Sequence, residues 1–170
     1  MRPAYHLAQV NIGITREPLD SVRLRGFMDM LDPVNALADA APGFVWRLQT
    51  EDGNATAVRA FPEYDVDGLL IINMSVWDSF DALAAFVYRS DHLEIMRRRR
   101  DWFERMPAAF LALWWIPAGQ IPTTADAEVR IAALRADGPS PFSFTFREHF
   151  PAPTDGEARH EDDRWGCPAG

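Results

Sequence analysis

The segment from residue 69 to residue 116 constrains the fold most strongly, because two apolar runs flank a long amphipathic stretch. The first run, residues 69–77, is too apolar for a strand with both faces in water, and the second covers residues 110–116. Between them, apolar side chains recur at helical spacing from residue 78 to residue 105, with a candidate break at residues 90–91. We therefore expect a strand, a long helix and a second strand here.

The N-terminal part of the chain predicts a strand, a helix and a hairpin. Residues 5–13 alternate between apolar and polar side chains, as in a strand with one buried face. Residues 20–38 have the spacing of a helix, which Pro33 is expected to kink or restart. Residues 44–50 indicate a second strand, and an Asp-Gly turn signature predicts that residues 55–61 return beside it.

The C-terminal part is expected to add a helix, an edge strand and a tail. Thr123 or Thr124 is a candidate cap for a surface helix that runs to about residue 136. The alternating residues 142–146 predict an edge strand. Proline, glycine and charged residues dominate residues 151–170, as expected of a polar, flexible tail.

The order of these elements predicts the fold class. Strand, helix, strand with a hairpin partner, strand, helix and strand form the split βαβ arrangement of a ferredoxin-like sandwich. We therefore predict a single α+β domain of βαββαβ type over residues 1–150, with the C-terminal helix and edge strand as additions. In this fold the two main helices cover one face of the sheet.

The second face of the sheet is expected to be partly polar and to need a partner. Its predicted members are too polar for a dry core or too apolar for water. They are Gln9, Asn11, Asn73 and Ser75 in the first group, and Leu7, Trp77 and Trp114 in the second. Two such sheets paired face to face in a homodimer would enclose a partly polar cavity between sheet and partner.

Composition excludes several classes of function. The formal net charge is -8, which disfavours a nucleic-acid partner, and the sequence contains no lysine, which excludes Schiff-base chemistry. The single cysteine, Cys167, excludes intrachain disulfides and Cys-rich metal sites. No stretch reaches the roughly 18 apolar residues that a membrane span requires, so no membrane partner and a cytoplasmic location are expected.

Several motifs together resemble those of the dimeric α/β-barrel superfamily, which includes antibiotic-biosynthesis monooxygenases and stress-responsive barrel proteins. The strand-to-helix signature at residues 75–83, continuing to residues 90–92, carries this resemblance. A narrower resemblance, to a bacterial family of unknown function within the superfamily, covers roughly residues 5 to 150. It is carried by residues 5–11, 43–49, 73–77 and 96–103. The resemblance implies a homodimer that forms an α/β barrel.

The candidate catalytic residues are His92, Asn11 and Asn73. His92 occupies the position at which the superfamily often has a histidine near the barrel mouth, and an imidazole of near-neutral pKa suits proton transfer. The alternative is a structural histidine at the start of a helix. Asn11 and Asn73, with Gln9 and Ser75, would donate hydrogen bonds to a substrate carbonyl or oxyanion, or would form a polar layer without a ligand.

The candidate substrate-binding residues add aromatic and charged groups. Trp77 and Trp114 offer flat walls for an aromatic ligand, although tryptophans on strands more often pack in a core or a dimer contact. Arg99 shares a helical stripe with His92 and Met96 and is a candidate for binding a substrate anion, as is Arg47. The alternative for the run of residues 97–100 is salt bridges with acidic neighbours on the helix.

No cofactor or metal is expected, because the histidines have no metal-ligand spacing and the glycines form no phosphate-binding loop. Haem-degrading members of the superfamily have their ligand histidine about one turn after the position of His92, where this chain has Met96 and Arg97. The first hypothesis is a cofactor-independent monooxygenase acting on an aromatic or polyketide-like small molecule. The alternatives are a non-catalytic, stress-associated ligand-binding barrel and a haem-binding barrel.

Overall fold

The computed structural model describes residues 3–154, without the side chains of residues 90–92, and the expected tail after residue 154 lies outside it. It contains four strands and four helices within these residues. In chain order they are β1 (Tyr5–Ile14), α1 (Arg25–Asp39), β2 (Phe44–Arg47), β3 (Leu70–Trp77), α2 (Phe80–Val87), α3 (Ser90–Trp102), β4 (Leu111–Pro117) and α4 (Thr124–Asp137).

The strands form one antiparallel sheet in the order β2-β3-β1-β4. Because β1 lies between β3 and β4, each half of the chain contributes one central and one edge strand. This is the strand order of a ferredoxin-like sandwich, so the predicted α+β fold class is confirmed.

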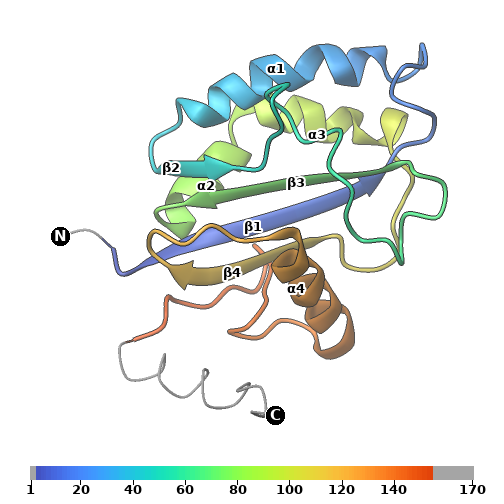
Figure 1. The fold of residues 1–170 in the computed structure, drawn as a ribbon. Helices are drawn as coiled ribbons and strands as arrows, with labels where there is room; N and C mark the ends of the chain where they lie inside the picture. The colour runs from blue at the N-terminus through green and yellow to red at the C-terminus, as the bar shows by residue number, and fades with distance from the viewer. Residues whose placement is uncertain (1–2, 155–170) are drawn as a thin grey trace.

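Helices cover both faces of this sheet, as Figure 1 shows: α1, α2 and α3 lie over one face and α4 under the other. We call these the inner face and the outer face. The outer-face residues Ala8, Val10 and Ile12 of β1 are fully buried. They belong to one core cluster with Ala127, Ile131 and Leu134 of α4 and with Phe61. The outer face is therefore covered within a single chain.

The expected placement of the polar strand residues is wrong. Gln9, Asn11, Asn73 and Ser75 lie on the inner face, beneath helices of their own chain, and not on a face closed by a partner subunit. The sequence pattern correctly distinguished a polar and an apolar face of the strands. It did not show that α4 would pack against the apolar face.

Local sequence explains where α4 begins. The Thr123 hydroxyl accepts a hydrogen bond from the Asp126 amide at 3.1 Å, and the Asp126 carboxylate accepts one from the Thr123 amide at 2.7 Å. This reciprocal capping box satisfies two amides that a helix start leaves without partners. The predicted helix start at Thr123 or Thr124 agrees with this structure.

The long helix expected before β4 is two helices. Ser79 caps α2 by accepting a hydrogen bond from the Ala82 amide at 3.1 Å. Arg89 has extended backbone angles and separates α2 from α3. The break therefore falls at residue 89, next to the candidate at residues 90–91. By contrast, α1 runs through Pro33 without a restart.

Two predicted strands are absent from the described residues. The Asn54 carboxamide accepts hydrogen bonds from both the amide and the hydroxyl of Thr56, at 3.0 and 2.6 Å, and this local turn diverts residues 55–61 from the sheet. The chain then reaches Phe61, which has a φ of 56° and is buried in the outer-face cluster. Residues 142–146 make a single bridge, from Phe144 to Leu113 at the β4 edge, instead of an edge strand.

Gly43 permits the close approach of the turn before β2 to α2. Its φ is 82°, and a Cβ at this position would lie 2.4 Å from the Ala82 Cβ and 2.5 Å from the Asp78 carboxylate. We predict that Gly43→Ala lowers the free energy of unfolding by about 2–4 kcal/mol, from backbone strain together with overpacking.

Urea denaturation measures this loss, and Gly119→Ala is the matched control. Gly119 has a φ of 93° but open space around its Cβ position, so the control retains the strain without the clash. Equal destabilisation of the two variants would contradict the steric part of the prediction.

Candidate functional site

A cavity of 310 Å³ lies between the inner face of the sheet and helices α1, α2 and α3. Two core clusters border it. One contains Leu7, Trp77 and Leu83 below α2, and the other contains Leu24, Trp102 and Phe103 below α1 and α3. The strand residues between these clusters are polar, so the space above them is not filled by an apolar core.

The floor of the cavity consists of polar side chains from the two central strands. Gln9 lies opposite Ser75 in the β1–β3 ladder, and Asn11 lies opposite Asn73. Directly opposed side chains on one face lie close enough to interact. We call these four residues the polar floor, and all of them line the cavity.

Gln9 organises the polar floor. Its Nε2 donates to Asn73 Oδ1 at 2.7 Å and to Ser75 Oγ at 2.9 Å. Since Asn73 Oδ1 accepts this bond, the Asn73 Nδ2 group is directed away from Gln9. Among the described residues, neither Asn73 Nδ2 nor the Asn11 carboxamide has a hydrogen-bond partner. These groups are available to a bound molecule.

Trp77 forms an aromatic wall at one end of the floor. The indole is buried and its Nε1 donates to Ser75 Oγ at 2.9 Å. The ring stacks on Phe86 of α2, with centroids 5.1 Å apart. Ser75 Oγ therefore accepts hydrogen bonds from both Gln9 and Trp77 and joins the wall to the floor.

The remaining wall and roof are mostly apolar. The contributing side chains come from α1, α2 and α3 and from the start of β4. They include Phe27, Met30, Val34, Val87, Ile95 and Leu111. Few polar groups in an apolar concave site are typical of small-molecule sites, because polar contacts orient a ligand whose affinity comes mostly from apolar burial.

Arg99 places a positive charge at the other end of the floor. Its Nη2 donates to the Ile12 carbonyl at 3.0 Å, and its guanidinium lies 4.8 Å from the ring centroids of both Phe103 and Phe110. No carboxylate in the described part of the chain pairs with it. Burial lowers the pKa of the Arg99 guanidinium from its ordinary value, because the charged form loses water.

Arg47 also lines the cavity, but its charge is neutralised. Its Nε and Nη2 donate to the Asp39 carboxylate at 2.7 and 3.2 Å, and Nη1 donates to the Gly53 carbonyl at 2.7 Å. This bidentate pair fixes β2 to the end of α1. The two cavity arginines therefore differ in their electrostatic state.

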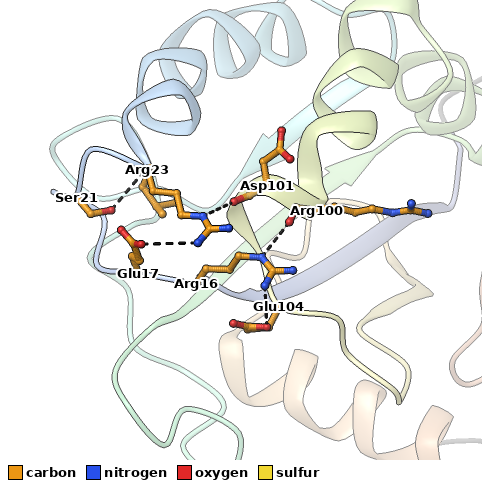
Figure 2. A network of polar contacts seen from close by, with 8 residues as sticks. Arg16, Glu17, Ser21, Arg23, Arg100, Asp101 and Glu104 are labelled. Carbon is orange, nitrogen blue, oxygen red and sulfur yellow. Dashed lines mark hydrogen bonds and ion pairs between the residues drawn. The ribbon is translucent and has the colours of Figure 1, made fainter.

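A polar network holds the end of α3 in place over the sheet, as Figure 2 shows. Arg16 donates to the Arg100 carbonyl at 2.9 Å and contacts the Glu104 carboxylate at 3.3 Å. Arg23 donates to the Asp101 carbonyl at 3.0 Å. Cationic groups on these carbonyls complement the helix C-terminus and thereby support the turn that carries Arg99.

Of the sequence-predicted site residues, most line the cavity, the side chain of one is not described, and one lies on the opposite face of the sheet. The structure brings together Gln9, Asn11, Asn73, Ser75, Trp77, Arg47, Arg99 and Met96, which all line the cavity. Met96 is half-exposed. The side chain of His92 lies outside the described residues, so its role stays a prediction.

Trp114 is the correction among these residues. It pairs with Ala8 and lies in the outer-face cluster, on the opposite side of the sheet from the cavity. The expected salt bridges of residues 97–100 are also wrong. The Glu104 carboxylate pairs with Arg16 instead, and Arg98 and Arg99 contact the rings of Trp102 and Phe103.

Sequence reasoning missed the site residues that come from α1 and the close packing at Gly13. A Cβ on Gly13 would lie 2.6 Å from the Phe103 ring and 3.1 Å from Arg99 Nη2. Helical spacing at Phe27, Met30 and Val34 showed an apolar face, but nothing in that spacing separated core from cavity wall. Gly13 indicated the end of a strand, whereas β1 continues to Ile14.

A metal ion or a haem group would need suitable ligand side chains at the site. No three His, Cys, Asp or Glu side chains in this part of the chain lie close enough together to hold a metal ion. The described lining residues include no histidine or cysteine, so they offer haem neither an imidazole nor a thiolate ligand. None of the described helices has the length and apolarity to cross a membrane.

The sheet order and the helices over the inner face define an α+β domain of the ferredoxin-like class. The chain belongs to the family described as "Domain of unknown function (DUF3291)", whose model matches residues 6–160. The resemblance to a family of unknown function is thereby confirmed. No protein of curated function matches the chain.

Solved structures similar to this chain share little sequence with it. A conserved protein from Methanosarcina mazei Go1 has 10% identity and a TM-score of 0.46, over 67% of this chain and 93% of that chain. PA3566 from Pseudomonas aeruginosa has 12% identity and a TM-score of 0.43, over 68% and 95%. SnoaB, a cofactor-independent oxygenase from Streptomyces nogalater, has 17% identity and a TM-score of 0.42, over 69% and 97%.

Ser75 provides a stability test of the site. We predict that Ser75→Ala lowers the free energy of unfolding by about 1–3 kcal/mol, because the Trp77 indole N–H and the Gln9 amide lose their shared acceptor. The measurement is urea denaturation of a cycle that combines Ser75→Ala with Trp77→Phe. The double variant should lose less than the sum of the single losses, and strict additivity would contradict the coupling of floor and wall.

Proposed function

We propose that this protein is a small-molecule enzyme of cofactor-independent monooxygenase type, acting on an aromatic or polyketide-like substrate in the inner-face cavity. The observation that carries the proposal is the row of carboxamides on the cavity floor, half-buried at Asn11 and exposed at Asn73, with both side chains free to donate hydrogen bonds. Such donors stabilise negative charge that develops on an oxygen of a bound substrate.

The proposed reaction oxidises an acidic methylene that aromatic rings conjugate to a ketone. A base removes one proton, and the electron pair that remains is delocalised onto the ketone oxygen. This carbanion supplies its electrons to dioxygen, so a C–O bond forms and a peroxide results. Loss of the second proton and cleavage of the O–O bond give a carbonyl and water, which balances R2CH2 + O2 as R2CO + H2O.

The residues would divide this chemistry between them. Asn11 and Asn73 would hold the ketone oxygen and stabilise the oxyanion. Trp77 and Phe86 would flank the aromatic rings and exclude water from the carbanion. His92, at the start of α3, is proposed as the base on the strength of the superfamily resemblance.

A second candidate function, ligand binding without catalysis, is favoured by a different observation. The described residues that line the cavity include no carboxylate and no imidazole. If His92 is not the base, the described lining offers no carboxylate or imidazole to accept the substrate proton, and the protein would bind its ligand without converting it. The two functions make opposite predictions about turnover.

Oxygen uptake tests the enzyme proposal. With anthrone as substrate, the wild-type protein is expected to consume dioxygen and form anthraquinone faster than the buffer blank. Asn73→Leu should lower kcat by about 10- to 1000-fold, since one oxyanion donor is removed while the apolar volume is kept. An oxygen electrode and the absorbance of anthraquinone measure the two sides of the reaction.

Gln120→Leu is the control, because Gln120 is exposed after β4 and does not line the cavity. His92→Ala should abolish turnover while leaving the circular-dichroism spectrum unchanged, and full activity of this variant would eliminate His92 as the base. Thermal stabilisation by anthrone with no product would favour the second candidate function.

The predicted homodimer is a further part of the proposal. Because the outer face is buried within one chain, a partner would contact other surfaces, such as the exposed β2 residue Val45. Sedimentation equilibrium should give twice the mass of one chain, and Val45→Arg should shift the equilibrium toward monomer. A single-chain mass for the wild type at high protein concentration would contradict the homodimer.

A further inference from the structure

Two arginines of the described part of the chain line the cavity, and their charges have different partners. Arg47 is paired with the Asp39 carboxylate through two hydrogen bonds. Arg99 has one hydrogen bond to the Ile12 carbonyl and contacts with two phenyl rings, and no described carboxylate reaches it. Among the described residues that line the cavity, Arg99 is therefore the cation without a paired carboxylate.

Arg99 is partly buried, and a cation that loses part of its water without a paired anion is destabilised, which is why buried charges in proteins are usually paired. The Ile12 carbonyl and the faces of Phe103 and Phe110 offset part of this cost, because both present negative electrostatic potential to the guanidinium. Neither group neutralises the charge. An anionic ligand would neutralise the charge. It would also accept charge-assisted hydrogen bonds from the guanidinium N–H groups of Arg99 that do not bind the Ile12 carbonyl.

The position of Arg99 relative to the polar floor limits the shape of such a ligand. Arg99 Nη2 lies above Gly13, on the same face of β1 as Asn11 and Gln9. Side chains on one face of a strand follow each other at about 7 Å. The guanidinium and the Asn11 carboxamide are therefore separated by a distance that one substituted aromatic ring spans.

We propose that the natural ligand of this cavity is an aromatic carboxylate, whose carboxylate binds Arg99 and whose ketone or hydroxyl oxygen binds Asn11 and Asn73. This inference rests on the proposed function and names its substrate class. The planar guanidinium matches a carboxylate in a bidentate arrangement. The net charge of -8 would repel an anion in general, so recognition depends on this local cation.

The test is calorimetric titration with two probes of matched shape, naphthalene carboxylate and its neutral carboxamide. The wild-type protein should bind the carboxylate more tightly than the carboxamide. Arg99→Gln should weaken carboxylate binding at least about tenfold and change carboxamide binding by less than about twofold. Arg99→Lys, which keeps the charge, should retain the preference for the carboxylate.

Arg97→Gln is the matched control. This substitution removes the same charge as Arg99→Gln, but Arg97 is an exposed residue of α3 that does not line the cavity. Equal affinity of the wild type for both probes, failure of the carboxylate to bind, or an equal effect of Arg97→Gln and Arg99→Gln would overturn the inference. Melting curves of each variant show whether it is folded.

Oxygen uptake with anthrone, which has no carboxylate, separates this inference from the proposed function. Anthrone turnover by a protein without carboxylate preference would overturn the anion site and leave the oxygenase standing. An Arg99-dependent carboxylate preference in a protein that turns over neither anthrone nor its carboxylate derivative would support the anion site and contradict the oxygenase.

Discussion

The antiparallel pairing of β1 with β3 is the interaction on which the rest of the structure depends. Its register places Gln9 opposite Ser75 and Asn11 opposite Asn73, so four polar side chains meet on one face of the sheet. A shift of one of these strands by one residue would send its two polar side chains to the outer face, among residues that are fully buried and apolar. The same pairing thus builds an apolar core on one side and a polar floor on the other.

The inner face is unevenly covered, and this unevenness creates the cavity. Aromatic clusters close it near Trp77 and near Phe103, while the polar residues between them leave no apolar surface for a helix to bury. Arg99 is directed into this space because Gly13 leaves room for it above the strand. The polar character of the site therefore results from the gap between the two apolar clusters.

The sequence predicted most of the fold and the four residues of the polar floor, whereas it missed most of the apolar cavity lining, and these failures have identifiable causes. In β1, Gln9 and Asn11 mark the phase of the strand, whereas residues 110–116 are almost uniformly apolar and carry no phase, which is why Trp114 was assigned to the wrong face. Helical spacing correctly separated Arg99 from its neighbours. The turn at Asn54 depends on side-chain hydrogen bonds that strand periodicity does not report. The packing of α4 against the outer face is a contact between segments far apart in the sequence, which a local sequence pattern cannot predict.

The late position of α4 in the chain has a consequence for synthesis. Ribosomes deliver the chain from its N-terminus, so β1 and β3 emerge well before residues 124–137 are made. Until then, the apolar side chains of Val10, Ile72 and Met74 have no covering helix. Before α4 is made, the nascent chain therefore exposes the apolar side chains of these strands. Chaperone binding to this apolar surface would matter more for this protein than for one whose covering helix precedes its strands.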